Sequence, residues 1–95
     1  MSNNKEKIVT KTFTILNKLG LHARPVAMFV KTANKYQSEI IVEKNNETVN
    51  GKSIMGMMML AAGKGSVIKV TAKGPDAEEA INEIEKLINN KFGEE

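Results

Sequence analysis

Several residue types are absent or scarce in this chain of 95 residues, and each absence excludes a class of site. The chain has no cysteine and no tryptophan, and it has one histidine. Disulfides, thiolate zinc sites, iron–sulfur clusters and sites with several histidine ligands are therefore excluded, so we expect no metal and no cofactor. No stretch approaches the roughly 20 apolar residues of a membrane span, and the polar residues 1–7 lack the apolar run of a signal peptide. We expect a cytoplasmic protein that is not inserted in a membrane.

The composition is otherwise that of a small globular protein, with 41% hydrophobic and 26% charged residues. A chain of this length forms one hydrophobic core and no second one. We expect a flexible N-terminal extension over residues 1–7, a single domain over residues 8–92 and a short C-terminal tail over residues 93–95. We also expect the protein to be a monomer.

The net charge of +3 hides an uneven distribution along the chain. Residues 1–75 carry 12 Lys or Arg against 4 Glu, a balance of +8, whereas residues 76–95 carry 2 Lys against 7 Asp or Glu, a balance of −5. A basic body favours an acidic partner or a phosphorylated ligand, although dispersed lysines also do no more than keep a protein soluble. The only arginine, Arg24, lies two residues after the only histidine, His22.

Alternating and helical spacings of apolar residues predict seven elements. Strands are expected at residues 8–16, 38–44, 47–50 and 67–73, and helices from His22 or Ala23 to about Lys35, over 54–62, and from 77 to about 92. Asn45 and Asn46 suit a two-residue hairpin turn. Ser53 is expected to cap the second helix and Gly63 to end it, and Asp76 with Glu79 forms an expected capping pair for the third. This order predicts an α+β open-faced sandwich, with three helices on one face of a four-stranded, mostly antiparallel sheet.

His22 is the strongest candidate for chemistry, because it follows a strand and a turn and stands at the expected start of a helix. Free amides and the positive end of the helix dipole favour an anion at that place and a neutral, nucleophilic imidazole. Arg24 adds a planar guanidinium that binds anions through parallel donors. Together these groups suit a phosphoryl group on nitrogen, although a lone histidine at a helix start is more often only a polar cap.

Two motifs resemble a known family. Gly20-Leu21-His22-Ala23-Arg24-Pro25, followed about thirty residues later by Gly51-Lys52-Ser53-Ile54-Met55-Gly56, is similar to the HPr family, the histidine-containing phosphocarrier proteins of the bacterial phosphoenolpyruvate–sugar phosphotransferase system. The likeness in element order covers about residues 8–90. It implies that His22 accepts phosphate from phosphorylated enzyme I and passes it to sugar-specific EIIA components. The chain would then be a stoichiometric phosphate carrier and not an enzyme.

The resemblance also implies roles for neighbouring residues. Arg24 would assist the phosphoryl group and Pro25 would set the geometry of the loop. Ser53 would be a regulatory site for an ATP-dependent HPr serine kinase/phosphorylase, as in Gram-positive HPr proteins, and a catabolite-control transcription regulator would be a further partner. The methionine-rich stretch that follows would share in docking, and we assign Ile54, Met55 and Met58 to that surface. Val26 departs from the alanine that the family most often has there.

Two other functions are compatible with parts of the sequence. HPr-like co-regulators act through protein binding alone, but they lack the histidine that this chain has. A small basic nucleic-acid-binding domain would explain the charge of residues 1–75, but one Tyr and three Phe offer no stacking platform. We therefore expect no nucleic acid as a partner.

Overall fold

A single antiparallel sheet is the base of the structure, a computed structural model that describes residues 7–94. Its strands are β1 (Lys7–Thr14), β2 (Glu39–Lys44), β3 (Glu47–Asn50) and β4 (Val67–Gly74), in the spatial order β1-β4-β2-β3. Every neighbouring pair is antiparallel. The predicted extension over residues 1–7 lies outside the described residues except for Lys7, with which β1 begins.

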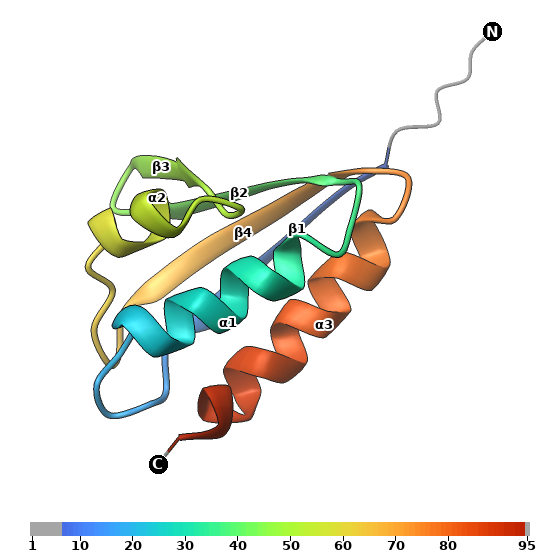
Figure 1. Ribbon diagram of the computed structural model, residues 1–95. Helices are drawn as coiled ribbons and strands as arrows, with labels where there is room; N and C mark the ends of the chain where they lie inside the picture. The colour runs from blue at the N-terminus through green and yellow to red at the C-terminus, as the bar shows by residue number, and fades with distance from the viewer. Residues whose placement is uncertain (1–6, 95) are drawn as a thin grey trace, which may run out of the picture.

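Three helices cover one face of this sheet (Figure 1). They are α1 (Ala23–Ala33), α2 (Ile54–Met59) and α3 (Ala77–Asn89), and a short 3-10 turn, η1 (Lys91–Gly93), follows α3. Helices α1 and α3 run side by side across β1 and β4, and α2 lies beside β3 (Figure 1). The predicted open-faced sandwich is confirmed, with the sheet wholly antiparallel.

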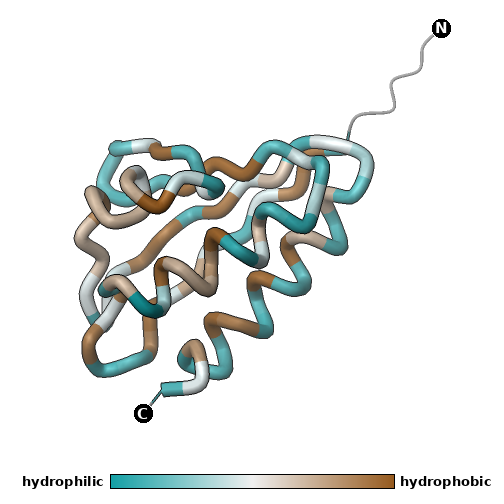
Figure 2. Tube along the Cα trace, in the orientation of Figure 1, coloured by the Kyte–Doolittle hydropathy of each residue, from teal (hydrophilic) through white to brown (hydrophobic). Residues whose placement is uncertain are grey.

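The core fills the space between the sheet and the helices. Hydropathy alternates along β4 (Figure 2), whose Ile68, Val70 and Ala72 are buried beneath α1 and α3. The opposite face of the sheet is open, and there the hydroxyls of Thr10 and Thr71 lie 3.1 Å apart across β1 and β4. The Thr-rich pattern of β1 therefore marks the solvated face, as the alternation predicts.

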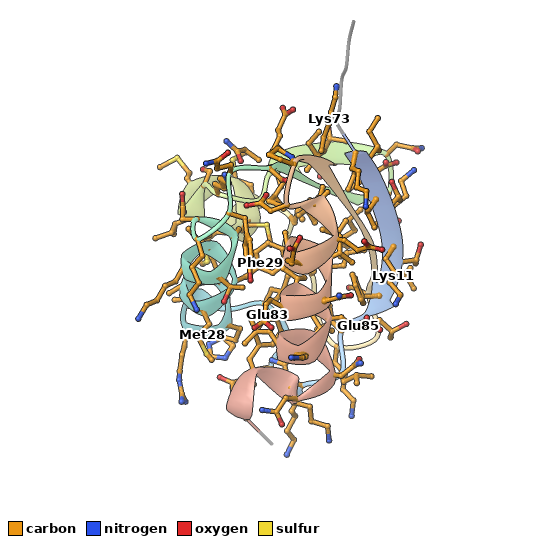
Figure 3. The ribbon with its side chains drawn as sticks, turned by 90° about the vertical axis from the view of Figure 1, so that its right-hand side faces the viewer. Lys11, Met28, Phe29, Lys73, Glu83 and Glu85 are labelled. Atoms are coloured by element: carbon orange, nitrogen blue, oxygen red, sulfur yellow. The ribbon has the colours of Figure 1, made fainter. Side chains whose placement is uncertain are left out.

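Lys11 interrupts the alternation of β1 for a reason that the structure makes plain. By the pleat of the strand, Lys11 shares its face with buried Phe13, but β1 is an edge strand. The ammonium of Lys11 bonds the Glu85 carboxylate of α3 at 2.8 Å, and Figure 3 shows the two side chains together at this edge. The ammonium of Lys11 thus lies outside the core, while the aliphatic part of its side chain can lie along the edge of the core.

The predicted end of the second helix is wrong. Helix α2 ends at Met59 and does not reach residue 62, because the chain turns at Ala61, whose φ is 50°. Lys44 reaches over from β2 and donates to the carbonyl of Leu60 at 3.1 Å. Gly63 is therefore not the residue that ends the helix.

Asp76 does not form the expected capping pair with Glu79, and its side chain makes no capping bond to α3. Its carboxylate accepts instead from the amides of Gln37 and Ser38, both at 2.9 Å, and from the Ser38 hydroxyl at 2.6 Å. The Ser38 hydroxyl contributes most to holding the pKa of Asp76 below its usual value. These bonds join the start of α3 to the start of β2.

The expected hairpin between β2 and β3 is confirmed. Asn45 and Asn46 have φ angles of 50° and 69°, as a tight turn of this kind requires.

The predicted ends of β1 at residue 16 and of α1 at residue 35 are two residues too long, because regular structure stops at Thr14 and Ala33.

Candidate functional site

A tight turn after β1 brings the chain to His22. The amide of Gly20 donates to the carbonyl of Asn17 at 3.0 Å, and Gly20 has a φ of 67°. A Cβ at this position would stand 2.6 Å from the carbonyl oxygen of Ala62, so that only glycine fits. The next amide, that of Leu21, donates to the same carbonyl at 2.8 Å. The turn before His22 is therefore packed against the segment that follows α2.

His22 is the N-cap of α1, and its side chain makes no capping bond. Its backbone carbonyl begins the helix by accepting from the amide of Val26 at 3.0 Å. The imidazole remains 38% exposed, while Pro25 and Val26 behind it are buried. Amides of the first helical turn have no acceptor within the helix, and they give this place a partial positive charge. A half-exposed ring thus lies at an end of a helix that favours anions.

Glu94 contacts His22, a contact that was not predicted from the sequence. The carboxylate oxygens of Glu94 lie 3.0 and 3.3 Å from Nε2 of the ring, and the Glu94 side chain is only 14% exposed. Asn17, fully buried, donates through Nδ2 to Glu94 at 3.0 Å and to the carbonyl of Gly20 at 2.7 Å. Three residues from the turn, the helix start and the C-terminal segment thus form one hydrogen-bonded group.

A run of left-handed residues carries Glu94 to this position. Lys91, Phe92 and Gly93 have φ angles of 55°, 55° and 74°, which turn the chain back after α3. Phe92 is fully buried and anchors the turn in the core. Glu94 consequently lies at the start of α1, against His22.

The carboxylate of Glu94 determines which nitrogen of His22 is free. An ionised carboxylate can only accept hydrogen bonds, so Nε2 must carry the hydrogen in this contact. In a neutral ring the lone pair is then on Nδ1. The arrangement offers a nucleophilic nitrogen with a fixed ring orientation.

Arg24 follows His22 by two residues in the first turn of α1 and is exposed. Within residues 7–94 its guanidinium makes no ion pair. It is therefore available to an anion brought to this end of the helix.

Ser53 is the N-cap of α2, as the sequence predicts. Its Oγ accepts from the amide of Gly56 at 3.0 Å, and the Ser53 amide donates to the carbonyl of Asn50 at 3.0 Å. A Cβ on Gly56 would stand 3.3 Å from both Ser53 Oγ and Val49 Cβ, which explains a glycine inside so short a helix.

The outward face of α2 is apolar. Met57 and Leu60 point into the core, whereas four neighbours are exposed; we call these four the α2 apolar surface: Ile54, Met55, Met58 and Met59. Three of them are the residues predicted from the sequence to form a docking surface, and Met59 is a fourth that the prediction did not include. The segment after α2 packs against Gly20 and Leu21, so this surface is adjacent in structure to the His22 turn.

Within residues 7–94 no group of three or more His, Asp or Glu side chains could hold a metal ion, and none of the helices there is long and apolar enough to cross a membrane. A groove of about 540 Å³ runs along α3 beside Tyr36, and its lining includes neither His22, Arg24 and Ser53 nor any residue of the α2 apolar surface. The chemistry of this part of the chain is therefore concentrated around His22.

The family match, a similar protein and a similar solved structure all point to the same family. Residues 9–90 match the family described as PTS HPr component phosphorylation site. The phosphocarrier protein HPr of Neisseria meningitidis serogroup A is 51% identical over 87 residues, which are 92% of this chain and 98% of that protein. The crystal structure of HPr-C-His from Thermoanaerobacter tengcongensis has a TM-score of 0.89 and 55% identity, covering 92% of this chain and 98% of that one.

The HPr-like protein Crh of Halalkalibacterium halodurans is also similar, at 44% identity over 84 residues, which are 88% of this chain and 100% of that protein. The similar proteins therefore include phosphocarrier proteins HPr and also an HPr-like protein, Crh.

Proposed function

The chain belongs to the HPr family of phosphocarrier proteins, and on this premise we propose that His22 carries a phosphoryl group from phosphorylated enzyme I to sugar-specific EIIA components. The observation that carries the proposal is the half-exposed imidazole at the start of α1, with Nε2 bound to Glu94 and Nδ1 left as the acceptor. In the transfer, the Nδ1–phosphorus bond forms as the bond from phosphorus to the donor breaks. In the second transfer, the Nδ1–phosphorus bond breaks as phosphorus forms a bond to the nucleophile of the EIIA component.

The surroundings of His22 suit a carrier. A carrier must stabilise the charge of the phosphoryl group while leaving phosphorus open to attack along the line of the breaking bond. The helix amides and Arg24 supply positive charge on one side, and the exposed ring leaves the other side to the partner protein. Pro25, buried in the first helical turn, fixes the backbone behind the ring without losing a hydrogen bond.

We further propose that partners dock on the α2 apolar surface and that phosphorylation of Ser53 regulates docking. Ser53 is partly exposed and directly precedes Ile54 of that surface. A phosphate at a helix N-terminus is compatible with the fold, but it would place about −1.5 to −2 charges beside apolar side chains that a partner must cover. An ATP-dependent HPr serine kinase/phosphorylase and a catabolite-control transcription regulator are the partners that this regulation would require.

Phosphorylation by enzyme I and phosphoenolpyruvate tests the proposed function directly. We expect intact-mass measurement to show one added phosphoryl group on the wild type and none on a folded His22→Ala variant, because no other imidazole is available. The label should be lost in acid and survive alkali. Ser53→Ala is the matched control and should accept the label like the wild type.

The same experiment separates the carrier from the co-regulator alternative. A wild-type chain that takes no label from enzyme I, yet is phosphorylated on Ser53 by a serine kinase, would support a co-regulator that acts by binding alone. Label on His22→Ala would contradict the assignment of the acceptor.

A further inference from the structure

Methionine is the side chain of this protein most open to oxidation. The chain has neither cysteine nor tryptophan, so thioethers are its only sulfur groups. Four of its six methionines lie within the six residues of α2. Oxidant in solution would react with those sulfurs of α2 that it can reach.

Burial divides the four methionines of α2 sharply. Met55 and Met59 are 74% and 72% exposed and are four residues apart, which places them on the same face of the helix. Met58, between them in sequence, is 41% exposed, whereas Met57 is 0% exposed. One short helix thus carries reactive thioethers and a protected one of the same chemistry.

From this arrangement we propose that Met55 and Met59 form a methionine-sulfoxide site that switches off partner docking. In the reaction the thioether sulfur gives two electrons to a hydroperoxide such as hydrogen peroxide. The O–O bond breaks, one oxygen forms the S=O bond, and the other leaves as water. The inference rests on the proposed function, because its effect depends on docking at the α2 apolar surface.

The fold should survive this modification, since the side chains that hold α2 in place are not among those oxidised. Met57 and Leu60 form its buried contacts, and Ser53 and Lys44 bind its two ends. A sulfoxide on Met55 or Met59 would stay in water in the free protein. In a complex it would be a polar group covered by an apolar partner surface, which is unfavourable without a hydrogen-bond donor.

The effect should appear in binding and not in chemistry. The His22 group of Asn17 and Glu94 contains no sulfur and is unchanged by oxidation. We expect the KM for the carrier in the enzyme I reaction to rise about tenfold, with kcat nearly unchanged, because one buried unpaired polar group has this effect on affinity. Methionine sulfoxide reductases should restore the original KM, since the modification is reversible.

The first experiment maps the site. The intact protein is treated with hydrogen peroxide and its peptides are measured by mass, and we expect Met55 and Met59 to be oxidised first, Met58 more slowly and Met57 last. Repeating the treatment in denaturant should bring Met57 to the rate of the others. Equal rates for Met57 and Met55 in the folded protein would overturn the proposed site.

The second experiment tests the switch with matched variants. The double variant Met55→Leu and Met59→Leu keeps apolar side chains of similar size but has no thioether at either position. Whatever its KM is before treatment, we expect peroxide to leave that KM unchanged. Met28→Leu is the control; Met28 lies on α1 (Figure 3), and this variant should remain as peroxide-sensitive as the wild type.

The outcomes of these experiments are distinguishable. An unchanged KM after both sulfoxides have formed, or a double variant that still loses affinity in peroxide, would overturn the switch while His22 phosphorylation stands. Failure of untreated protein to accept phosphate would instead refute the proposed function.

Discussion

The His22 site and the α2 apolar surface are adjacent in the fold but are built in opposite ways. Around His22, polar side chains hold one another, since Asn17 fixes Glu94 and Glu94 fixes the ring. On the α2 apolar surface the exposed side chains are apolar, and three of the four are methionines, whose unbranched thioethers adapt to different contacts. A transferred phosphoryl group requires a nitrogen in one fixed orientation, whereas a surface that meets several partners benefits from side chains that adapt. The proposed phosphoryl transfer and the proposed docking of partners thus fall on separate elements.

The largest effect after loss of His22 itself is expected from Arg24→Lys. Lysine keeps the charge but loses the planar pair of donors, and we expect transfer from enzyme I and to EIIA to slow by about ten- to a hundredfold. Rapid-quench kinetics with both partners measures it. Lys31→Ala, which removes an exposed cation from the last turn of the same helix, is the control and should change little. Equal rates for Arg24→Lys and wild type would show that Arg24 is ordinary surface charge.

Ser53→Asp adds a charge next to the α2 apolar surface and should have an intermediate effect on the rate of phosphorylation. We expect the rate of phosphorylation by enzyme I to fall about three- to tenfold, because one negative charge is introduced where a partner must exclude water. The melting temperature should be maintained, because aspartate also caps helices. Asn46→Asp adds the same charge on the exposed β2–β3 turn and should be silent. An unchanged rate with a lowered melting temperature would mean that Ser53 is only a structural cap.

Glu94→Gln should have a smaller effect on transfer and a clear effect on the ring. A glutamine amide can accept from Nε2–H or donate to a bare Nε2, so both neutral tautomers become populated. We expect the rate to fall about two- to fivefold, as part of the molecules lose the free Nδ1. Nitrogen-15 NMR of His22 should show one tautomer in the wild type and a mixture in the variant.

Glu79→Gln is the control for this prediction, because Glu79 is an exposed carboxylate near the opposite end of α3. A wild-type spectrum that already shows two tautomers would remove Glu94 from the account of the site.

Asp76→Asn should leave both regions alone and change only stability. Loss of a charged acceptor for the amides of Gln37 and Ser38 should lower the free energy of unfolding by about 1 to 2 kcal/mol at neutral pH. The pKa of Asp76 is lowered by folding, so its contribution is complete above the usual value of 3.8 and is lost as pH falls through the lowered pKa. Thermal melting at several pH values should show the difference between wild type and variant closing in acid. A constant difference would contradict the role of the ionised carboxylate.

The sequence predicts the elements well where local pattern decides them. The apolar stripe of α3, the alternation of β4 and the turn at Asn45 depend on residues close in sequence, and the structure confirms them. The capping pair at Asp76 fails because the carboxylate binds residues 37 and 38, which no local pattern reveals. The end of α2 fails because Ala61 adopts a left-handed φ that the nearby Gly63 would adopt more readily.

The candidate site divides in the same way. His22 and Arg24 stand out because they are the only histidine and the only arginine of the chain, and they lie two residues apart. Glu94 is 72 residues from His22 in the chain, and its position depends on a turn of three residues with positive φ and on the burial of Phe92. Glycine at 93 and an aromatic residue at the end of the α3 stripe were the available signals, and neither indicates a partner.

Gly20 lies at a close contact between the His22 turn and the segment that follows α2. Its missing side chain allows the turn before His22 to touch the carbonyl of Ala62, just after α2. A methyl group there would have to push these segments apart, so we expect Gly20→Ala to displace the His22 ring and α2 together. The contact at this glycine therefore couples the position of the His22 turn to that of the segment after α2.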